Sequence, residues 1–253
     1  MSKPKGETMF KAEIKSDTMK GLVNIVSTLI DEVKFTVDPE GMSLKAVDPA
    51  HVAMIELRVE AGAFESYAAD ETEIGLDLDK VKGVLKLASS GDIITIEQDE
   101  DHGKLVFKVG NITRRMHLVD TSGINDPKVP QLSLSAKVRI AVDELQQGIR
   151  ASETISDHIA LTASPEGFEL SCEGDTDSAS LVVPKDKLER LEAEGTYCSL
   201  FPLDYFANLV KAIPAGTVVN IELDKDYPIN IRFEIAEGKG RVDYLLAPRI
   251  ESD

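Results

Sequence analysis

One stretch of the chain occurs twice, and this repeat constrains the fold more than any other sequence feature. Residues 12–44 align with residues 138–170 without a gap. Each copy has an alternating apolar opening, a helical run, an aliphatic residue two positions before an Asp (Leu29 and Asp31, Ile155 and Asp157), a short strand and Pro-Glu-Gly. Gly41 corresponds to Gly167, a shift of 126 residues (167 − 41). This period is about half the chain and too long for a solenoid repeat, so it predicts a duplicated domain.

Length and composition are those expected of a soluble protein with two domains. The 253 residues suffice for two ordinary cores, and the 42% hydrophobic content is mainly aliphatic, with no Trp. No apolar run approaches the roughly 18 residues of a membrane span, and no signal-peptide pattern opens the chain. Cys172 and Cys198 stand far apart without a CxxC motif. We therefore expect a reducing cytoplasmic location.

Hydrophobic periodicity predicts the same order of strand, helix and strands in each half. Alternating strands favour antiparallel sheets with one face toward the core, which makes the chain α+β. Four amphipathic helices are expected, starting near Asp17 or Thr18, Asp79, Asp143 and Leu203. The Gly- and Pro-rich stretch after Val119 indicates a linker. The predicted parts are a disordered tail (1–8), a first domain (9–119), a connecting loop (120–134) and a second domain (135–253).

No residue pattern typical of catalysis is found in the chain. The sequence contains no phosphate-binding lysine loop, and its four histidines lack metal-ligand spacing. Asp99, Asp101 and His102 are the nearest approach to a metal cluster, which leaves a metal-dependent hydrolase as one alternative. An acidic hairpin tip is the more common interpretation of such a run. We therefore expect a binding or scaffolding protein that is not an enzyme and needs no metal or cofactor.

Basic residues recur on the outer faces of the expected helices. The net charge of −17 argues against sequence-independent DNA binding by the whole surface. A cationic stripe on duplicated helices would nevertheless contact phosphates without reading bases. Ordinary solvated helix faces are the simpler interpretation of any one helix. The residues concerned, called here the helix cations, are Lys20, Lys80, Lys82, Lys86, Arg150 and Lys211.

Four segments resemble the proliferating cell nuclear antigen family of DNA sliding clamps in its archaeal form: residues 9–12 (MFKA), 44–52 (LKAVDPAHV), 92–95 (DIIT) and 244–253 (YLLAPRIESD). The resemblance implies a homotrimeric ring of the DNA-clamp fold around duplex DNA, with helices lining the central hole and sheets outside. It implies a processivity factor in replication and repair that is associated with the nucleoid. The helix cations would face the DNA. Implied partners are DNA polymerase, a clamp loader, flap endonuclease, ligase and other proteins with a short peptide motif.

The resemblance also implies a pocket for partner peptides and an interface between subunits. The pocket would consist of Val47, His51, Met54, Val129, Pro130, Leu132, Leu134, Pro228, Leu245, Ala247, Pro248 and Ile250. Edge strands within 111–118 and 176–183 would join neighbouring subunits. The interface residues would be Lys82, Arg114, Arg115, Met116, Asp143, Glu144, Ser178, Ala179 and Ser180. The alternative is a peptide-binding adaptor that does not encircle DNA.

Overall fold

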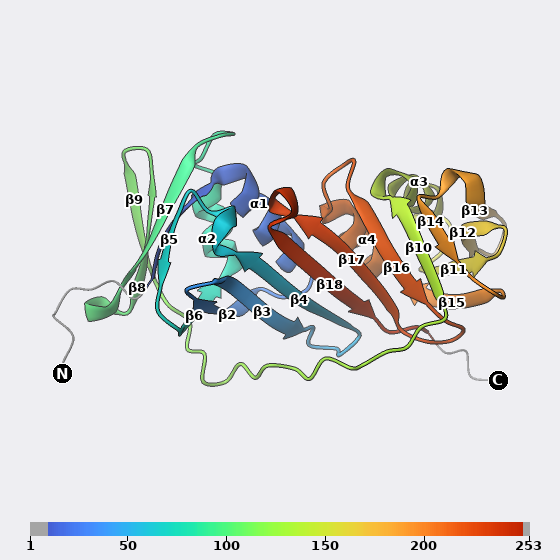
Figure 1. Ribbon diagram of the computed structural model, residues 1–253, viewed down its shortest axis with the longest axis horizontal. Coiled ribbons are helices and arrows are strands. Elements are labelled where there is room, and N and C mark those ends of the chain that lie inside the picture. The colour runs from blue at the N-terminus through green and yellow to red at the C-terminus, as the bar shows by residue number, and fades with distance from the viewer. Residues whose placement is uncertain (1–9, 250–253) are drawn as a thin grey trace. The chain divides into compact units, whose positions relative to one another are not determined.

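The computed structural model describes residues 10–249 and divides the chain into two compact units (Figure 1). Unit 1 contains the residues up to Ala46, then Glu56–Pro127 and Ile235–Arg241. Unit 2 contains Val47–Ile55, Lys128–Glu234 and the residues from Val242 onward. Each unit thus incorporates a segment from the other half of the sequence. The predicted tail, residues 1–8, lies outside the described residues.

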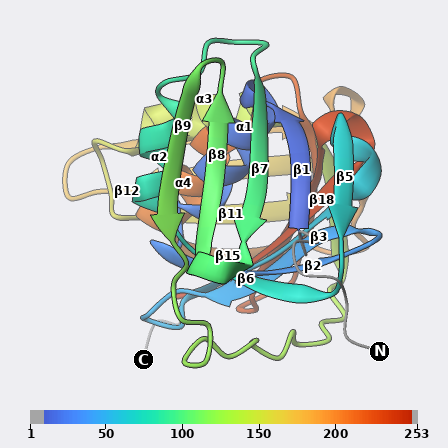
Figure 2. The same cartoon turned by 90° about the vertical axis from the view of Figure 1, so that its left-hand side faces the viewer.

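Unit 1 contains the first two helices and most of the strands of the first repeat. Strands β5, β1, β7, β8 and β9 form an antiparallel sheet in that order, which faces the viewer in Figure 2. Strands β4, β3, β2 and β6 lie side by side. The elements are β1 (Phe10–Lys15), α1 (Ser16–Val26), β2 (Glu32–Asp38), β3 (Gly41–Val47), β4 (Ala53–Glu60), β5 (Ser66–Ala69), β6 (Thr72–Asp77), α2 (Leu78–Leu85), β7 (Ile93–Asp99), β8 (Lys104–Val109) and β9 (Ile112–His117).

Unit 2 repeats this plan. Strands β13, β12, β11 and β15 form one antiparallel sheet, and β14, β10, β16, β17 and β18 are neighbours in another (Figure 1). The elements are β10 (Ala136–Ala141), α3 (Val142–Ser152), β11 (His158–Ser164), β12 (Gly167–Glu173), β13 (Ser178–Pro184), β14 (Arg190–Glu192), β15 (Tyr197–Pro202), α4 (Leu203–Ala212), β16 (Val218–Leu223), β17 (Ile229–Ile235) and β18 (Gly240–Leu246).

The repeated residues make corresponding hydrogen bonds in the two units. The carbonyl of Asp31 accepts from the amide of Leu78 at the start of α2, and Asp157 accepts in the same way from Leu203 at the start of α4, at 2.8 and 2.9 Å. The repeated Asp thus joins the segment after one helix to the beginning of the next. Gly41 and Gly167 lie so close to a neighbouring carbonyl that an added Cβ would stand 2.1 and 2.4 Å from its oxygen.

Two predicted helix starts differ from the structure in their caps. The residue before α1 is Lys15, which makes no side-chain cap. Asp17 instead accepts from the Ser90 hydroxyl and the Gly91 amide at 2.8 and 2.9 Å, which lowers the pKa of its carboxyl. Helix α2 is capped by Asp77 and not by Asp79, since the Asp77 carboxylate accepts from the amide of Lys80.

Two short strands were not predicted from the sequence. Ser66–Ala69 forms β5 beside β1. Arg190–Glu192 forms β14 beside β10 in the corresponding place. Both are outer strands with no buried residue, so they lack the apolar alternation that marks a strand in a sequence.

Aliphatic and Phe side chains fill the core of each unit, as the composition predicts. In unit 1 these include Ile14, Ile74 and Phe107, which are at most 2% exposed. In unit 2, Phe201 and Phe206 are fully buried. Helices α1 and α2 are in contact, as are α3 and α4. Within residues 10–249 no helix is both long enough and apolar enough to cross a membrane.

Candidate functional site

The helix cations differ in how far the protein already neutralises them. Lys80 and Lys82 pair with Asp77 and Asp79 one turn away, at 2.8 and 3.3 Å. The hydrogen bond and charge of Asp77 raise the pKa of Lys80. Lys211, at the end of α4, pairs with a carboxylate beyond α3. These cations remain exposed or half-buried, so a phosphate reaching them must compete with a carboxylate.

The remaining helix cations are one tethered lysine and two free cations. Lys20 is half-buried, and its ammonium donates to the carbonyl of Ala88 at 2.7 Å. Gln146 corresponds to Lys20 in the repeat and donates to the carbonyl of Ile213 at 3.4 Å, so each residue ties the first half of its helix to the segment after the next helix. Lys86 and Arg150 are exposed and form no ion pair within residues 10–249. They are the helix cations most available to an external anion.

A turn between β3 and β4 in unit 2 is built around one buried carboxylate, Asp48, which is only 3% exposed. We call residues 48–53 the Asp48 turn. The Oδ1 atom accepts from the amides of Val52 and Ala53 at 2.7 Å each, and Oδ2 accepts from the amide of Ala50 at 3.0 Å. Within the turn, His51 is exposed and has a φ of 57°, in the left-handed region. The carboxylate therefore holds a backbone conformation that the sequence alone does not favour.

A residue from helix α4 donates a further hydrogen bond to this carboxylate. The hydroxyl of Tyr205 donates to Asp48 Oδ2 at 2.8 Å. Desolvation is the largest influence on Asp48 and raises its pKa, but the hydrogen bonds from Ala53, Tyr205, Ala50 and Val52 together bring the pKa below its ordinary value. The same bond raises the pKa of Tyr205, because the neutral hydroxyl is the donor. Asp48 is thus held as an anion.

The structure brings several predicted pocket residues together around the Asp48 turn. Val47 ends β3 and His51 lies in the turn. Met54 is the second residue of β4, and 8% of its surface is exposed. The amide of Ala247 donates to the carbonyl of Val52 at 2.8 Å, which brings the segment after β18 alongside the turn. Leu245, Ala247 and Pro248 are half-buried there, whereas Ile250 lies outside the described residues.

Strand β15 provides the scaffold for the other predicted pocket segments. The carbonyl of Leu200 accepts from the amide of Arg249 at 2.7 Å. The Ser199 hydroxyl donates to the Asp224 carbonyl at 2.7 Å, and the Asp224 carboxylate accepts from the Ser135 hydroxyl, which follows the connecting loop. Of the predicted residues on these segments, Leu134 is buried, Val129, Leu132 and Pro228 are half-buried, and Pro130 is exposed.

The first part of the connecting loop is fixed to unit 1. The amide of Val119 donates to the carbonyl of Gly75 in β6 at 2.9 Å. This approach requires glycine, because a Cβ on Gly75 would stand 2.1 Å from the Val119 carbonyl oxygen. Farther along, Asp126 pairs at 3.0 Å with Lys34, a lysine of β2 whose side chain is only 8% exposed. These two contacts therefore hold the first half of the connecting loop against unit 1.

Strands β9 and β13, which carry predicted interface residues, lie at the edges of their sheets. Each has one strand neighbour, and its other backbone edge is unpaired among the described residues. Their apolar side chains are unusually exposed, 47% for Ile112 and 62% for Val182. An open edge with exposed apolar residues is a template for pairing with another strand.

The remaining predicted interface residues flank these strands. Arg114 is exposed on β9, and its guanidinium Nη1 lies 3.3 Å from the position of a Cβ on Gly83 in α2. Helix α3 packs against β13. At the start of α3, Asp143 accepts from the amide of Gly216 at 2.8 Å, whereas Glu144 has no partner within residues 10–249. The remaining predicted residues show mixed burial: Arg115, Ser178 and Ser180 are exposed, Ala179 and Lys82 are half-buried, and Met116 is buried.

The acidic tip that suggested a metal site is a paired turn. His102 Nδ1 lies 2.9 Å from Asp99 Oδ1, and this hydrogen bond is the main reason that the pKa of Asp99 is lowered. Asp101 is exposed nearby. Among residues 10–249, no three His, Cys, Asp or Glu side chains are arranged to hold a metal ion.

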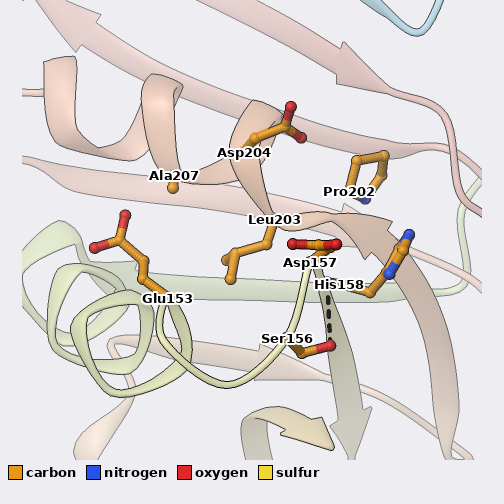
Figure 3. Close-up of a pocket in the computed structure, with 8 residues that line it drawn as sticks. All are labelled: Glu153, Ser156, Asp157, His158, Pro202, Leu203, Asp204 and Ala207. Carbon is orange, nitrogen blue, oxygen red and sulfur yellow. Dashed lines mark hydrogen bonds between the residues drawn. The ribbon is translucent and has the colours of Figure 1, made fainter. Parts of the chain in front are cut away.

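Two neighbouring cavities that share Ser156 and His158 lie in unit 2. One, of about 450 Å³, opens between the end of α3 and the start of α4 (Figure 3). Its lining includes the carboxylates of Glu153, Asp157 and Asp204, so it repels phosphate. The other, of about 620 Å³, follows β11, β12 and β13 and is bordered by Arg249, whose guanidinium Nη1 lies 3.0 Å from His158 Nδ1.

Sequence analysis did not identify three residues that organise these surfaces. Lys34 and Tyr205 make their key contacts with Asp126 and Asp48, which are distant in sequence, so no local pattern marks them. Asp48 carries a local signal, because Asp-Pro is a common turn opening in which the carboxylate accepts from following amides. That signal predicts the turn but not its burial.

The chain matches known proteins along almost all of its length. Residues 9–121 match the family model for the proliferating cell nuclear antigen N-terminal domain, and residues 128–249 match the model for its C-terminal domain. The DNA polymerase sliding clamp of Methanosarcina barkeri is 45% identical over 246 residues, covering 97% of this chain and all of that protein. The clamp of Natronomonas pharaonis is 39% identical with the same coverage.

Solved structures agree with this assignment. The structure described as the C-terminal region of FEN-1 bound to A. fulgidus PCNA has a TM-score of 0.91 and 31% identity, covering 97% of this chain and all of that one. PCNA from Thermococcus kodakaraensis shares the fold with a TM-score of 0.88 at 24% identity, covering 95% of this chain and all of that one. The resemblance drawn from the four sequence segments is thus confirmed, and the chain belongs to the proliferating cell nuclear antigen family.

Proposed function

We propose that the protein is a sliding clamp that encircles duplex DNA and tethers DNA polymerase and other replication and repair proteins to it. The observation that carries this proposal is its similarity, over 97% of the chain, to relatives named DNA polymerase sliding clamp. The clamp has no catalytic activity of its own. It confers processivity because a closed ring cannot dissociate from DNA sideways, so the tethered enzyme slides instead of leaving.

Ring formation uses the two open sheet edges. Strand β9 of one subunit pairs with β13 of the next, and this contact satisfies both unpaired edges and covers Ile112 and Val182. Because β9 and β13 are different surfaces of one chain, the contact is head-to-tail. A rotation of one third of a turn at each contact closes such a chain of subunits into a ring of three. The cations Lys82 and Arg114 then face Glu144 across the contact, which favours this register over others.

The helix cations face the DNA in the hole of this ring. Their attraction to phosphates is the same at every base pair, so the ring can move along the duplex. Lys86 and Arg150 contribute most, because the other four are partly satisfied within the chain. Opening the ring to admit DNA requires an ATP-driven clamp loader, since the chain contains no phosphate-binding loop of its own.

Partner proteins bind through short peptides in the pocket beside the Asp48 turn. Its walls are the segment after β18, the second half of the connecting loop and the loop before β17. Half-buried apolar side chains such as Leu132, Pro228 and Leu245 suit an aromatic anchor, and exposed backbone beside them suits polar groups of the peptide. Flap endonuclease, ligase, DNA polymerase and the clamp loader are the expected partners. We place the protein in the cytoplasm with the nucleoid.

The domain boundaries proposed for this function are residues 9–119 and 135–253, joined by a connecting loop at 120–134. The Val119 amide bond to Gly75 marks the end of the first domain. The Ser135 hydroxyl bond to Asp224 marks the start of the second. Between them the loop supplies pocket residues and is anchored near its middle by the ion pair between Asp126 and Lys34.

Retention on circular DNA tests encirclement directly. The protein is loaded onto nicked circular DNA with its clamp loader, the complex is isolated by gel filtration, and half of the sample is then cut once. A ring stays on the circle and leaves after linearisation, whereas equal retention on both DNA forms would favour the peptide-binding adaptor. Light scattering should give a mass of three chains.

A matched pair of variants tests whether the ring assembles through the sheet edges. Val182→Asp places a charge on the open edge of β13 and should convert trimers to monomers. Ile93→Asp makes the same change at another exposed apolar residue, 40% exposed, on β7, which is an inner strand of its sheet. That control should remain trimeric. Equal masses for the two variants would reject the proposed pairing of β9 with β13.

A further inference from the structure

The hydrogen bond between Tyr205 and Asp48 joins two functionally different parts of unit 2. Tyr205 lies in the first turn of α4, the helix that carries Lys211 near its other end. Asp48 lies in the turn that borders the proposed peptide pocket. The two residues are 157 positions apart in sequence, and their side chains meet at 2.8 Å. This is the only side-chain donor to Asp48 among residues 10–249, because its other partners are backbone amides.

We propose that Tyr205 is a positioning residue for partner binding: its hydroxyl orients the Asp48 carboxylate, which in turn holds the Asp48 turn in the shape that receives the peptide. This inference rests on the proposed sliding-clamp function and adds a residue outside the pocket to it. It makes α4 a support for the peptide site in addition to carrying a helix cation.

The geometry of the carboxylate explains why one hydroxyl matters. Oδ1 is occupied by the amides of Val52 and Ala53, and Oδ2 by the amide of Ala50 and by Tyr205. All three amides belong to the Asp48 turn itself. Tyr205 instead belongs to α4, and the next residue of that helix, Phe206, is fully buried in the core. The Tyr205 hydroxyl is therefore the one donor from outside the turn among the described residues, and its hydrogen bond fixes the orientation of the carboxylate plane.

The turn needs such support because its backbone is not in a preferred conformation. His51 has a φ of 57°, in the left-handed region that residues with a side chain rarely adopt. If the carboxylate rotates, the amides of Val52 and Ala53 lose their acceptor and the turn can relax. The carbonyl of Val52, which accepts from Ala247, would then move away from the segment after β18. The Asp48 turn and the segment after β18, which both border the proposed pocket, would therefore shift together.

The test measures peptide affinity by calorimetry on the full-length protein. The probe is a synthetic peptide with the sequence of the C-terminal region of A. fulgidus FEN-1, the region named in the related structure. Tyr205→Phe keeps the ring and removes the hydroxyl, and it should weaken binding about tenfold. Tyr67→Phe is the matched control. It removes a half-buried hydroxyl that donates to the Gly41 carbonyl at 2.5 Å in unit 1, and it should leave affinity unchanged.

A double-mutant cycle separates positioning through Asp48 from a simple packing role. In an Asp48→Asn background the carboxylate is already lost, so adding Tyr205→Phe should weaken binding by less than twofold. A tenfold loss in both backgrounds would mean that Tyr205 does not act through Asp48 and would overturn the proposal. Hydrogen exchange gives a second measurement: Tyr205→Phe should speed exchange at the amides of Val52 and Ala53, and Tyr67→Phe should not.

The outcomes distinguish the inference from the function on which it rests. If the wild-type protein does not bind the peptide, the proposed partner site fails and the inference fails with it. If the wild type binds and Tyr205→Phe binds equally well, only the inference is rejected. Should Tyr205→Phe fail to assemble as a trimer, the peptide affinity of Asp48→Asn is measured instead. Undiminished peptide affinity in that variant would show that the carboxylate does not shape the pocket.

Discussion

Lys34 offers a sharp test of the energetics of the connecting loop. Its side chain is 8% exposed, and its ammonium lies 3.2 Å from Glu73 and 3.0 Å from Asp126. The two carboxylates are far more exposed, 48% and 54%. The hydrogen bond that the Lys34 ammonium donates to Asp126 is the main reason that the pKa of Lys34 is raised, against the opposing effect of burial. The three members of this cluster therefore carry very different desolvation costs.

This difference in burial predicts that removing the cation changes stability little, whereas removing its two partners destabilises the protein. Lys34→Met deletes the buried charge and keeps the apolar stem, while both carboxylates return to water. We expect the free energy of unfolding to change by less than about 1 kcal/mol. Glu73→Gln combined with Asp126→Asn leaves the ammonium buried without a counter-charge. That double variant should lose about 2 kcal/mol, the penalty of an unpaired buried charge that retains neutral acceptors.

Urea denaturation at one protein and salt concentration measures both variants, since assembly makes apparent stability depend on concentration. The raised pKa of Lys34 means that its contribution is complete below the unfolded value of about 10.4 and is lost only as pH rises through the higher folded value. The ranking should therefore hold across neutral pH. If Lys34→Met proved as destabilising as the double variant, the reasoning from unequal burial would be refuted.

Three further predictions follow from single residues. Lys86→Gln should reduce the salt slope of DNA binding by about one, whereas Lys80→Gln should change it less, because Asp77 already pairs with Lys80 at 2.8 Å; salt titrations of DNA affinity compare the two. Because the pKa of Asp48 is lowered, its contribution to stability is present above about pH 4 and lost as pH falls further, so the Tm difference between wild type and Asp48→Asn should shrink below that pH. Gly75→Ala should displace the start of the connecting loop, since its Cβ would stand 2.1 Å from a carbonyl oxygen; faster hydrogen exchange at the Val119 amide would reveal this.

The repeat predicted the fold well because it encodes both local patterns and long-range bonds. The alternation of apolar residues located the strands that have a buried face, and four helices begin within three residues of the predicted starts. The outer strands β5 and β14 were missed because strands without buried residues leave no such pattern. Periodicity thus reports on burial, and it identifies a strand only where burial accompanies it.

The candidate site was less predictable, because periodicity identifies a helix face but not what that face contacts. Lys20 was correctly assigned to the outer stripe of α1, yet its ammonium is bound to the Ala88 carbonyl. Nothing in the neighbouring sequence indicates this partner. Likewise, the Asp-Pro pair indicates the Asp48 turn, but its donor Tyr205 is 157 residues away and belongs to the other repeat. Contacts between distant segments require the fold.

If the helix cations face the DNA, as proposed, their pairing predicts loose binding by this strongly acidic protein. With a net charge of −17, long-range attraction to DNA cannot come from the molecule as a whole, so it depends on cations concentrated on the helices. Three of these cations are paired with nearby carboxylates and one with a carbonyl. A phosphate must displace the existing partner of each, so the net gain per contact is small and is similar at every position along the duplex. Weak attraction that does not vary with position is what sliding requires, and in the proposed ring the pairing of these four cations would contribute to it.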